Sequence, residues 1–266
     1  MSTTEPTPGL VQDLMEPLPR AALVPMVHAA LGIPRDQSEK VVKAFDDFVA
    51  RPLRNNLAKL TGRELARRNP MIYTTRGVST VSDWVDWILA DKETSAIEAH
   101  IGTWQEEVAR IASGGIKPGS GVDLQIDRED GVVELYAIQG SHNTKNSGGR
   151  RHDVEALKRA ARPLRASRRH VDLKIGVLSG RPKSAFMRSE PDIEVLASDD
   201  FWERVSGIAD FRARLLRATI ALASLIKSRS AEEVLRIKGE AMVLFADVAG
   251  GIDLEALANP PETARR

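Results

Sequence analysis

The sequence predicts an α/β protein in which a sheet core lies between two helical blocks. Three observations support this prediction. Apolar residues recur with helical spacing from Pro19 to about Gly114, the pattern changes to short strand-like runs from Val122 to Ala197, and helical spacing returns over residues 198–249. A chain of 266 residues with 42% hydrophobic residues is also long enough to bury a sizeable core.

The N-terminal block is expected to be entirely helical. Within it, Val81, Trp84, Val85 and Ile88 have the spacing of one buried helix face. A further helix is predicted over 94–111, where apolar residues recur at intervals of three and four. The stretch SGGIKPGSG then ends the helix, because glycine and proline both weaken helices.

The central block reads as a sheet with one long helix. The runs VDLQID and VVELYAIQ predict two strands, and the turn-forming REDG between them is a hairpin signal. A loop rich in Gly, Asn and Ser leads to a helix predicted from about Asp153 to Arg165. VDLKIGVLSG and DIEVLA predict two more strands before the C-terminal helices.

Composition narrows the class of protein. There is no cysteine, which excludes a disulfide framework and thiolate zinc sites and is compatible with a reducing compartment. The N-terminus MSTTEPTPGL lacks the basic and apolar regions of a signal peptide, and no run of about 18 apolar residues could span a bilayer. We therefore expect a cytoplasmic protein with no membrane segment.

Charge is balanced overall but unevenly distributed. Lys plus Arg total 38 and Asp plus Glu total 37, so the net charge does not indicate a nucleic-acid binder. Residues 145–170, however, contain nine Lys or Arg against only Asp153 and Glu155, and the preceding stretch 123–134 is rich in acids. An acidic pocket beside a basic surface is expected of a metal-dependent enzyme that acts on a polyanion.

The hairpin places candidate catalytic residues near one end of the sheet. Side chains two apart on a strand share a face, so Ala137 and Gln139 point the same way, and Asp123 lies on the partner strand. This suits Mg²⁺, which needs only one or two protein carboxylates beside waters and substrate phosphate. A second carboxylate can come from Glu98 or Glu106, which lie two turns apart on the preceding helix. The alternative is that both are ordinary solvated glutamates.

The order of these motifs resembles the type II restriction endonucleases of the PD-(D/E)XK superfamily. The motifs are a helix with Glu-x3-Gly-x3-Glu, a strand with Gly-Val-Asp-Leu, and a strand that runs into AIQGSHN and an Asn-Ser step. NPMIYTTRGVSTVSDWVDWIL, GTWQEEVA and FWERVSG add to the likeness, which covers roughly residues 65–225. The resemblance implies a restriction-endonuclease-like mixed sheet core flanked by helices.

Carried over onto this sequence, the resemblance implies that Asp123 binds the metal, with Glu98 or Glu106 as the helix-borne acid. The metal is expected to be Mg²⁺, with Mn²⁺ as the alternative. Ala137 takes the place of the second motif acid and Gln139 that of the motif lysine. A lysine can orient or deprotonate the attacking water and offset negative charge, whereas a glutamine amide can only hydrogen-bond. The superfamily contains active members with glutamine at this position, so the replacement does not imply loss of catalysis. The missing lysine charge implies a slower or more metal-dependent enzyme.

The basic helix offers a surface for the nucleic-acid backbone. Val154, Leu157, Ala161 and Leu164 form its predicted buried stripe, and basic residues lie beside that stripe. Such contacts position a duplex without reading its sequence, and base readout is expected from the loop before the helix. A solvated basic face is the alternative. The residues expected to contact nucleic acid are Asn143, Lys145, Asn146, Arg150, Arg151, Lys158 and Arg162.

The leading hypothesis is a Mg²⁺-dependent, site-specific endonuclease for double-stranded DNA in a restriction or other anti-phage defence system. The rival is a non-catalytic DNA-binding or scaffolding subunit that kept the nuclease fold after losing the lysine. RNA cleavage is a third reading, because the phosphate chemistry is shared. A homodimer is expected, since a symmetric substrate suits a two-fold protein, and a methyltransferase or another defence protein is the expected partner.

The sequence is expected to divide into five regions. They are a disordered N-terminus (1–17), a helical N-terminal region (18–92), the nuclease core (93–200), C-terminal helices (201–256) and a flexible tail (257–266).

Overall fold

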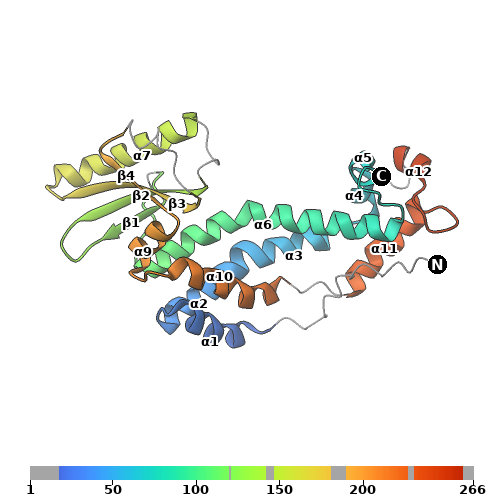
Figure 1. Cartoon of the computed structure of the whole chain (residues 1–266), viewed down its shortest axis with the longest axis horizontal. Coiled ribbons are helices and arrows are strands. Elements are labelled where there is room, and N and C mark those ends of the chain that lie inside the picture. Colours follow the sequence, from blue (N-terminus) through green and yellow to red (C-terminus); the bar gives the residue numbers. More distant parts are fainter. Residues whose placement is uncertain (1–17, 120, 142–146, 181–189, 227–230, 260–266) are drawn as a thin grey trace, which may run out of the picture. The chain divides into compact units, whose positions relative to one another are not determined.

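The computed structural model describes residues 18–119, 121–141, 147–180, 190–226 and 231–259 (Figure 1). Within them a four-stranded mixed sheet is flanked by helices, which confirms the predicted α/β class. Residues 1–17, for which the sequence predicts disorder, and 260–266 of the expected tail lie outside the described residues.

The elements follow one another along the chain in the predicted order of helices, sheet and helices. They are α1 (Arg20–Leu31), α2 (Arg35–Phe45), the π-helix η1 (Asp46–Ala50), α3 (Arg51–Ala58), α4 (Gly62–Ala66), α5 (Pro70–Thr74), α6 (Val81–Ser113), β1 (Leu124–Asp127), β2 (Val133–Ser141), α7 (Ser147–Ala166), β3 (Val171–Ser179), β4 (Ile193–Ala197), α9 (Asp199–Ser206), α10 (Phe211–Leu222), the 3-10 helix η2 (Ala223–Leu225), α11 (Ala231–Phe245) and α12 (Leu254–Ala258).

The chain forms two compact units, and the long helix α6 contributes residues to both. The sheet unit comprises residues 19–52 and 94–222, and the helical unit includes 53–93 and the described residues of 223–259. The two helical segments expected around Val81 and over 94–111 are one helix. The residues between them contain no glycine or proline, so nothing in the sequence stops the helix there.

The sheet has the strand order β1-β2-β3-β4. β1 pairs with β2 antiparallel, with Leu124 opposite Tyr136, so the predicted hairpin is confirmed. β2, β3 and β4 run parallel to one another. Parallel neighbours need a crossover connection, and α7 provides it between β2 and β3 while covering one face of the sheet (Figure 1).

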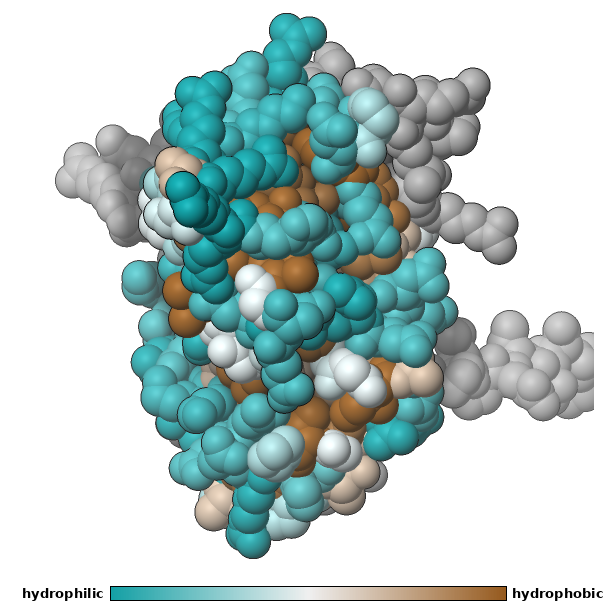
Figure 2. Space-filling model, turned by 90° about the vertical axis from the view of Figure 1, so that its left-hand side faces the viewer, coloured by the Kyte–Doolittle hydropathy of each residue, from teal (hydrophilic) through white to brown (hydrophobic). Residues whose placement is uncertain are grey.

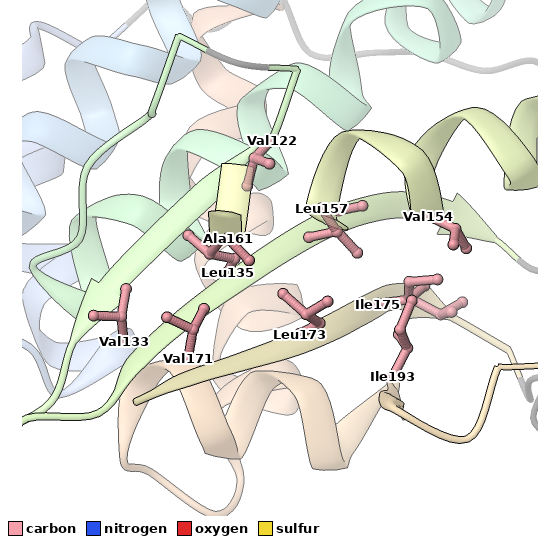
Figure 3. Close-up of a cluster of buried hydrophobic side chains, with 12 residues drawn as sticks. Val122, Val133, Leu135, Val154, Leu157, Ala161, Val171, Leu173, Ile175 and Ile193 are labelled. Carbon is pink, nitrogen blue, oxygen red and sulfur yellow. The ribbon is translucent and has the colours of Figure 1, made fainter. Parts of the chain in front are cut away.

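An apolar core joins α7 to this face (Figure 3). Residues at every second position of β2 point toward the helix and pack with residues of α7 and β3. The predicted stripe of α7 is confirmed, because Val154, Leu157 and Ala161 are buried and Leu164 is partly buried against the same cluster. The cluster also includes Val122, just before β1.

The opposite face of β2 carries a buried ion cluster. The Glu134 side chain is fully buried and its carboxylate accepts hydrogen bonds from Arg128 Nε (2.8 Å), Arg204 Nε (2.9 Å) and the Tyr136 hydroxyl (2.8 Å). The Lys174 ammonium lies 3.7 Å away. Burial alone raises the pKa of Glu134, but the hydrogen bonds from Arg204, Arg128 and Tyr136 outweigh it and hold this pKa below its usual value. The cluster ties the hairpin turn to α9.

Helix α9 covers this second face at close range. A Cβ placed on Gly176 of β3 would collide with the ring of Phe201 on α9, so glycine is required for the approach. Phe201 in turn lies edge-on to Tyr136, with ring centroids 6.0 Å apart. Elsewhere in the sheet unit, α1 packs against α2 and α10, and Trp104 of α6 lies edge-on to Phe45 at 5.2 Å.

The helical unit is built around Trp84 on α6. Its ring lies edge-on to Phe245 of α11 (5.5 Å between centroids) and to Tyr73 of α5 (6.3 Å). The carboxylate of Glu240 on α11 accepts a hydrogen bond from the Gly62 N–H at the start of α4 (2.8 Å). These contacts anchor α11 to α4, α5 and the first half of α6.

We predict that Glu134→Gln lowers the free energy of unfolding at pH 7 by about 1.5–3 kcal/mol, because it removes the buried charge that accepts hydrogen bonds from Arg128 and Arg204. In the wild type, the pKa of the Glu134 carboxyl is lowered in the folded state. Its stabilising effect is therefore present above the unfolded pKa of about 4.3 and is lost as the pH falls toward the folded pKa. Below about pH 4.3, the free energy of unfolding should therefore fall less steeply with falling pH in the variant than in the wild type. Urea unfolding at several pH values measures this, with Glu129→Gln in the exposed hairpin turn as the charge-matched control. Equal acid dependence in wild type and Glu134→Gln would contradict the prediction.

We also predict opposite effects of two glycine-to-alanine changes. Gly176→Ala should destabilise by about 1–3 kcal/mol, because the added methyl group displaces Phe201. Gly102→Ala should stabilise by about 0.5–1 kcal/mol, because a Cβ in this part of α6 meets no atom of the described residues within 4 Å and alanine is the better helix former. Thermal unfolding of both variants checks these predictions. A change of the same sign in both would indicate a general effect of replacing glycine rather than the close approach of α9.

Candidate active site at the end of strand β2

Gln139 lies near the C-terminal end of β2, on the face that packs against α7. It is 5% exposed, and its Nε2 donates a hydrogen bond of 2.9 Å to Asp153 Oδ2 of α7, which is also 5% exposed. An ionised carboxylate can only accept hydrogen bonds, so the amide must present its NH₂ group to Asp153. The carbonyl oxygen of Gln139 is then fixed at the other end of the amide.

Asp123 lies immediately before β1 and is bonded to the neighbouring part of β2. Its N–H donates to the Tyr136 carbonyl (2.9 Å), and its Oδ2 accepts from the Ile138 N–H (2.7 Å). Since β1 starts one residue later, the carboxylate takes the place of a backbone carbonyl in the sheet ladder. The structure thus brings Asp123 next to the residue that precedes Gln139, as the hairpin pattern predicted.

The two helix glutamates differ in position along α6. Glu98 is exposed and lies 15 residues before the end of the helix, which is about 22 Å along its axis. Glu106 is partly buried, only about 10 Å from that end, and its Oε2 lies 3.9 Å from Lys117 Nζ. The segment after α6 pairs with β1 through Ile116 and Gln125. Glu106 is therefore the glutamate closer to the helix end that leads into the hairpin.

The nucleic-acid residues expected from the sequence fall in two groups. Asn143, Lys145 and Asn146 lie outside the described residues. On α7, the side chains of Arg151, Lys158 and Arg162 are exposed and follow one another along one face, and Arg150 is half-buried. Lys158 donates to Glu190 (2.7 Å), so its charge is partly matched within the protein.

Figure 2 shows that the visible surface of the sheet unit is largely hydrophilic. Hydrophilic side chains cover most of its upper part, where the sheet and α7 lie in Figure 1, and hydrophobic side chains show between them. Such a surface can accept a polyanion only where cations dominate. In the described residues, the exposed face of α7 is the candidate identified by position and charge.

The donor atoms at the end of β2 have the chemistry of a hard-cation site. The carboxylates of Asp123 and Asp153 and the amide oxygen of Gln139 are all oxygen donors, which suit Mg²⁺ or Mn²⁺. The described residues contain no group of three or more His, Cys, Asp or Glu that could hold a metal. Mg²⁺ fits a smaller set, because it retains several waters and binds substrate phosphate as well.

Sequence reasoning missed the burial of Asp153. The sequence pattern predicts Asp153 only as the start of a helix and as one of two acids in a basic segment. The signal was present, because Asp153, Leu157 and Ala161 are spaced four apart and so share a helix face. An acid on an otherwise apolar stripe predicts a buried carboxylate with a specific partner.

A hairpin followed by a helical crossover into parallel strands, with helices on both faces, is consistent with a restriction-endonuclease-like fold. The family model for type II restriction endonuclease EcoO109I matches residues 36–224, well over half of the chain. The chain belongs to this family, and the resemblance seen in its motifs is confirmed. No curated protein matches the chain. Among the described residues, no helix has the length and apolar character needed to cross a membrane.

Proposed function

We propose that the protein is a divalent-metal-dependent endonuclease that hydrolyses phosphodiester bonds of double-stranded DNA in restriction or anti-phage defence. Membership of the EcoO109I family supports the class of reaction. The observation that carries the proposal for this chain is the placement of Asp123, whose carboxylate is held at the end of β2 beside Gln139. When bound here, Mg²⁺ or Mn²⁺ would polarise the scissile phosphate and make water acidic enough to attack it.

The residues of the chain then have distinct tasks. Asp123 is fixed by the Ile138 N–H, so it presents its carboxylate in a defined direction. Gln139 has its NH₂ group turned to Asp153, so its carbonyl oxygen can accept a hydrogen bond from the attacking water and orient it. It adds no positive charge to offset the charge that develops on the phosphate, so slow turnover is expected. Of the helix glutamates, Glu106 is better placed than Glu98 to assist.

The second candidate function is a non-catalytic DNA-binding subunit with a nuclease fold. Gln139 favours it, because an amide cannot replace the ammonium group expected at this position. Both candidates require DNA to lie along the basic face of α7, and only the first requires strand cleavage. Metal-dependent cleavage of plasmid DNA therefore separates them.

The proposal extends to assembly and partners. A nuclease that cuts both strands of a symmetric DNA site is well served by two copies related by a two-fold axis, so we propose a homodimer. An enzyme that cuts DNA at defined sites also needs those sites protected in its own cell. A methyltransferase acting on the same sequence is the partner that this requirement implies.

We predict that Asp123→Asn reduces plasmid cleavage at least about 100-fold in Mg²⁺ or Mn²⁺, because the variant removes a charged metal ligand. The asparagine oxygen can still accept from the Ile138 N–H, so thermal stability should change little. Asp127→Asn is the matched control, since this exposed aspartate is the last residue of the strand that Asp123 precedes. Retained cleavage in Asp123→Asn would sink the assignment, and absence of cleavage in the wild type with intact DNA binding would favour the non-catalytic subunit.

We predict that Arg151→Ala and Arg162→Ala weaken DNA binding to a similar degree on all sequences, because phosphate contacts carry no sequence information. Each change should also reduce the slope of log affinity against log salt concentration by about 1. Fluorescence anisotropy at several salt concentrations measures both effects. Lys40→Ala, which removes an exposed charge from α2, should leave the slope unchanged. A loss limited to one DNA sequence would instead indicate base readout.

A further inference from the structure

The strand that should carry the second acid of the site does not carry one. Of the residues near the end of β2 on the face toward α7, Ala137 has a methyl group and is 1% exposed, and Gln139 is neutral. Ala137 packs in the apolar core beneath α7. The small side chain lets the helix lie close to the strand at this point, so a carboxylate can come from the helix instead.

Helix α7 places a carboxylate at that point. Asp153 precedes Val154 and lies one turn before Leu157, both of which are buried in the core cluster that includes Ala137. Figure 3 shows Leu157 and Val154 following one another along α7 toward the C-terminal end of β2. The hydrogen bond of 2.9 Å from Gln139 to Asp153 fixes the carboxylate directly over the strand end.

Asp123 approaches the same part of α7. A Cβ placed on Gly121 would lie 3.6 Å from the Cβ of Ala156, so the segment that leads into Asp123 lies against α7 within one turn of Asp153. Two residues later, the Asp123 carboxylate is bound to the Ile138 N–H, beside Gln139. The Gln139 amide therefore contacts the Asp153 carboxylate directly, and the residue just before Gln139 binds the Asp123 carboxylate through its N–H.

We propose that Asp153 is the second metal-binding carboxylate of this site and takes over from the strand acid that Ala137 replaces. This inference rests on the proposed metal-dependent function. It assigns the metal to Asp123 and Asp153, with Gln139 holding the Asp153 carboxylate in place through its NH₂ group. The acid needed at the site thus comes from the crossover helix after β2, and Glu98 and Glu106 of α6 are not required as ligands.

Binding of Mn²⁺ to the full chain without DNA tests the assignment, with free Mn²⁺ followed by its paramagnetic resonance signal. Asp153→Asn and Asp123→Asn should each weaken the affinity by more than the ~10–100-fold that loss of an outer-shell partner causes. Glu155→Gln, which changes an exposed acid two residues further along α7, should change the affinity less than about threefold. The asparagine oxygen at 153 can still accept from Gln139, so circular dichroism should show a folded variant. Unchanged Mn²⁺ affinity in folded Asp153→Asn would overturn the proposal.

A second measurement uses the wild-type chain and does not depend on the folding of a variant. Fe²⁺ with ascorbate and peroxide at the same site should cut the backbone next to the bound metal, near both residue 123 and residue 153. Cuts near 123 and 106 without one near 153 would assign the second carboxylate to α6 and overturn the inference. If the wild type binds Mn²⁺ through Asp153 but never cleaves DNA, the proposed nuclease function fails and the metal site stands. If cleavage depends on Asp123 but Asp153→Asn binds Mn²⁺ normally, the proposed nuclease function stands and the assignment of Asp153 as a metal ligand fails.

Discussion

The structure of the sheet unit depends on the alternation of side chains along β2, a central strand that is covered on both faces. Alternate residues point to α7 on one side and α9 on the other, so a polar side chain on β2 is buried whichever way it points. Buried polar groups need hydrogen-bond partners within the protein. Glu134 and Gln139, both buried polar residues of β2, meet this requirement in different ways.

Glu134 is ionised and is surrounded by cations. Arg128 comes from the hairpin turn, Arg204 from α9 and Lys174 from β3, so three elements converge on one carboxylate. Tyr136 adds a hydroxyl donor, and burial together with the adjacent Glu134 charge raises the pKa of this tyrosine, so it remains a neutral donor. This arrangement offsets the charge of Glu134 inside the protein and leaves no reason to assign it a ligand. Its role is to hold the hairpin, the sheet and α9 together.

The sequence was sufficient for the features that depend on periodicity. Alternation and the REDG turn predicted the hairpin, and the spacing of Val154, Leu157 and Ala161 predicted the face that α7 buries. The sequence was insufficient for features that depend on tertiary contacts. Helix α7 begins at Ser147 rather than near Asp153, although helix propensity alone disfavours its glycine-rich first turn. The alternation placed Glu134 on the face opposite Gln139, but its burial depends on α9, which follows about 65 residues later.

The pairing of Gln139 with Asp153 gives a physical reason for the glutamine. In the expected pattern, a strand acid and a lysine lie two residues apart, and their opposite charges offset each other. Here the strand contributes no charge, while α7 contributes a carboxylate that the neutral amide can hold without neutralising it. A lysine at 139 would form an ion pair with Asp153 and compete with a cation for that carboxylate. Under the metal-dependent function proposed above, glutamine would favour metal affinity over stabilisation of the developing phosphate charge. The loss of the lysine and the loss of the strand acid would then make sense only together.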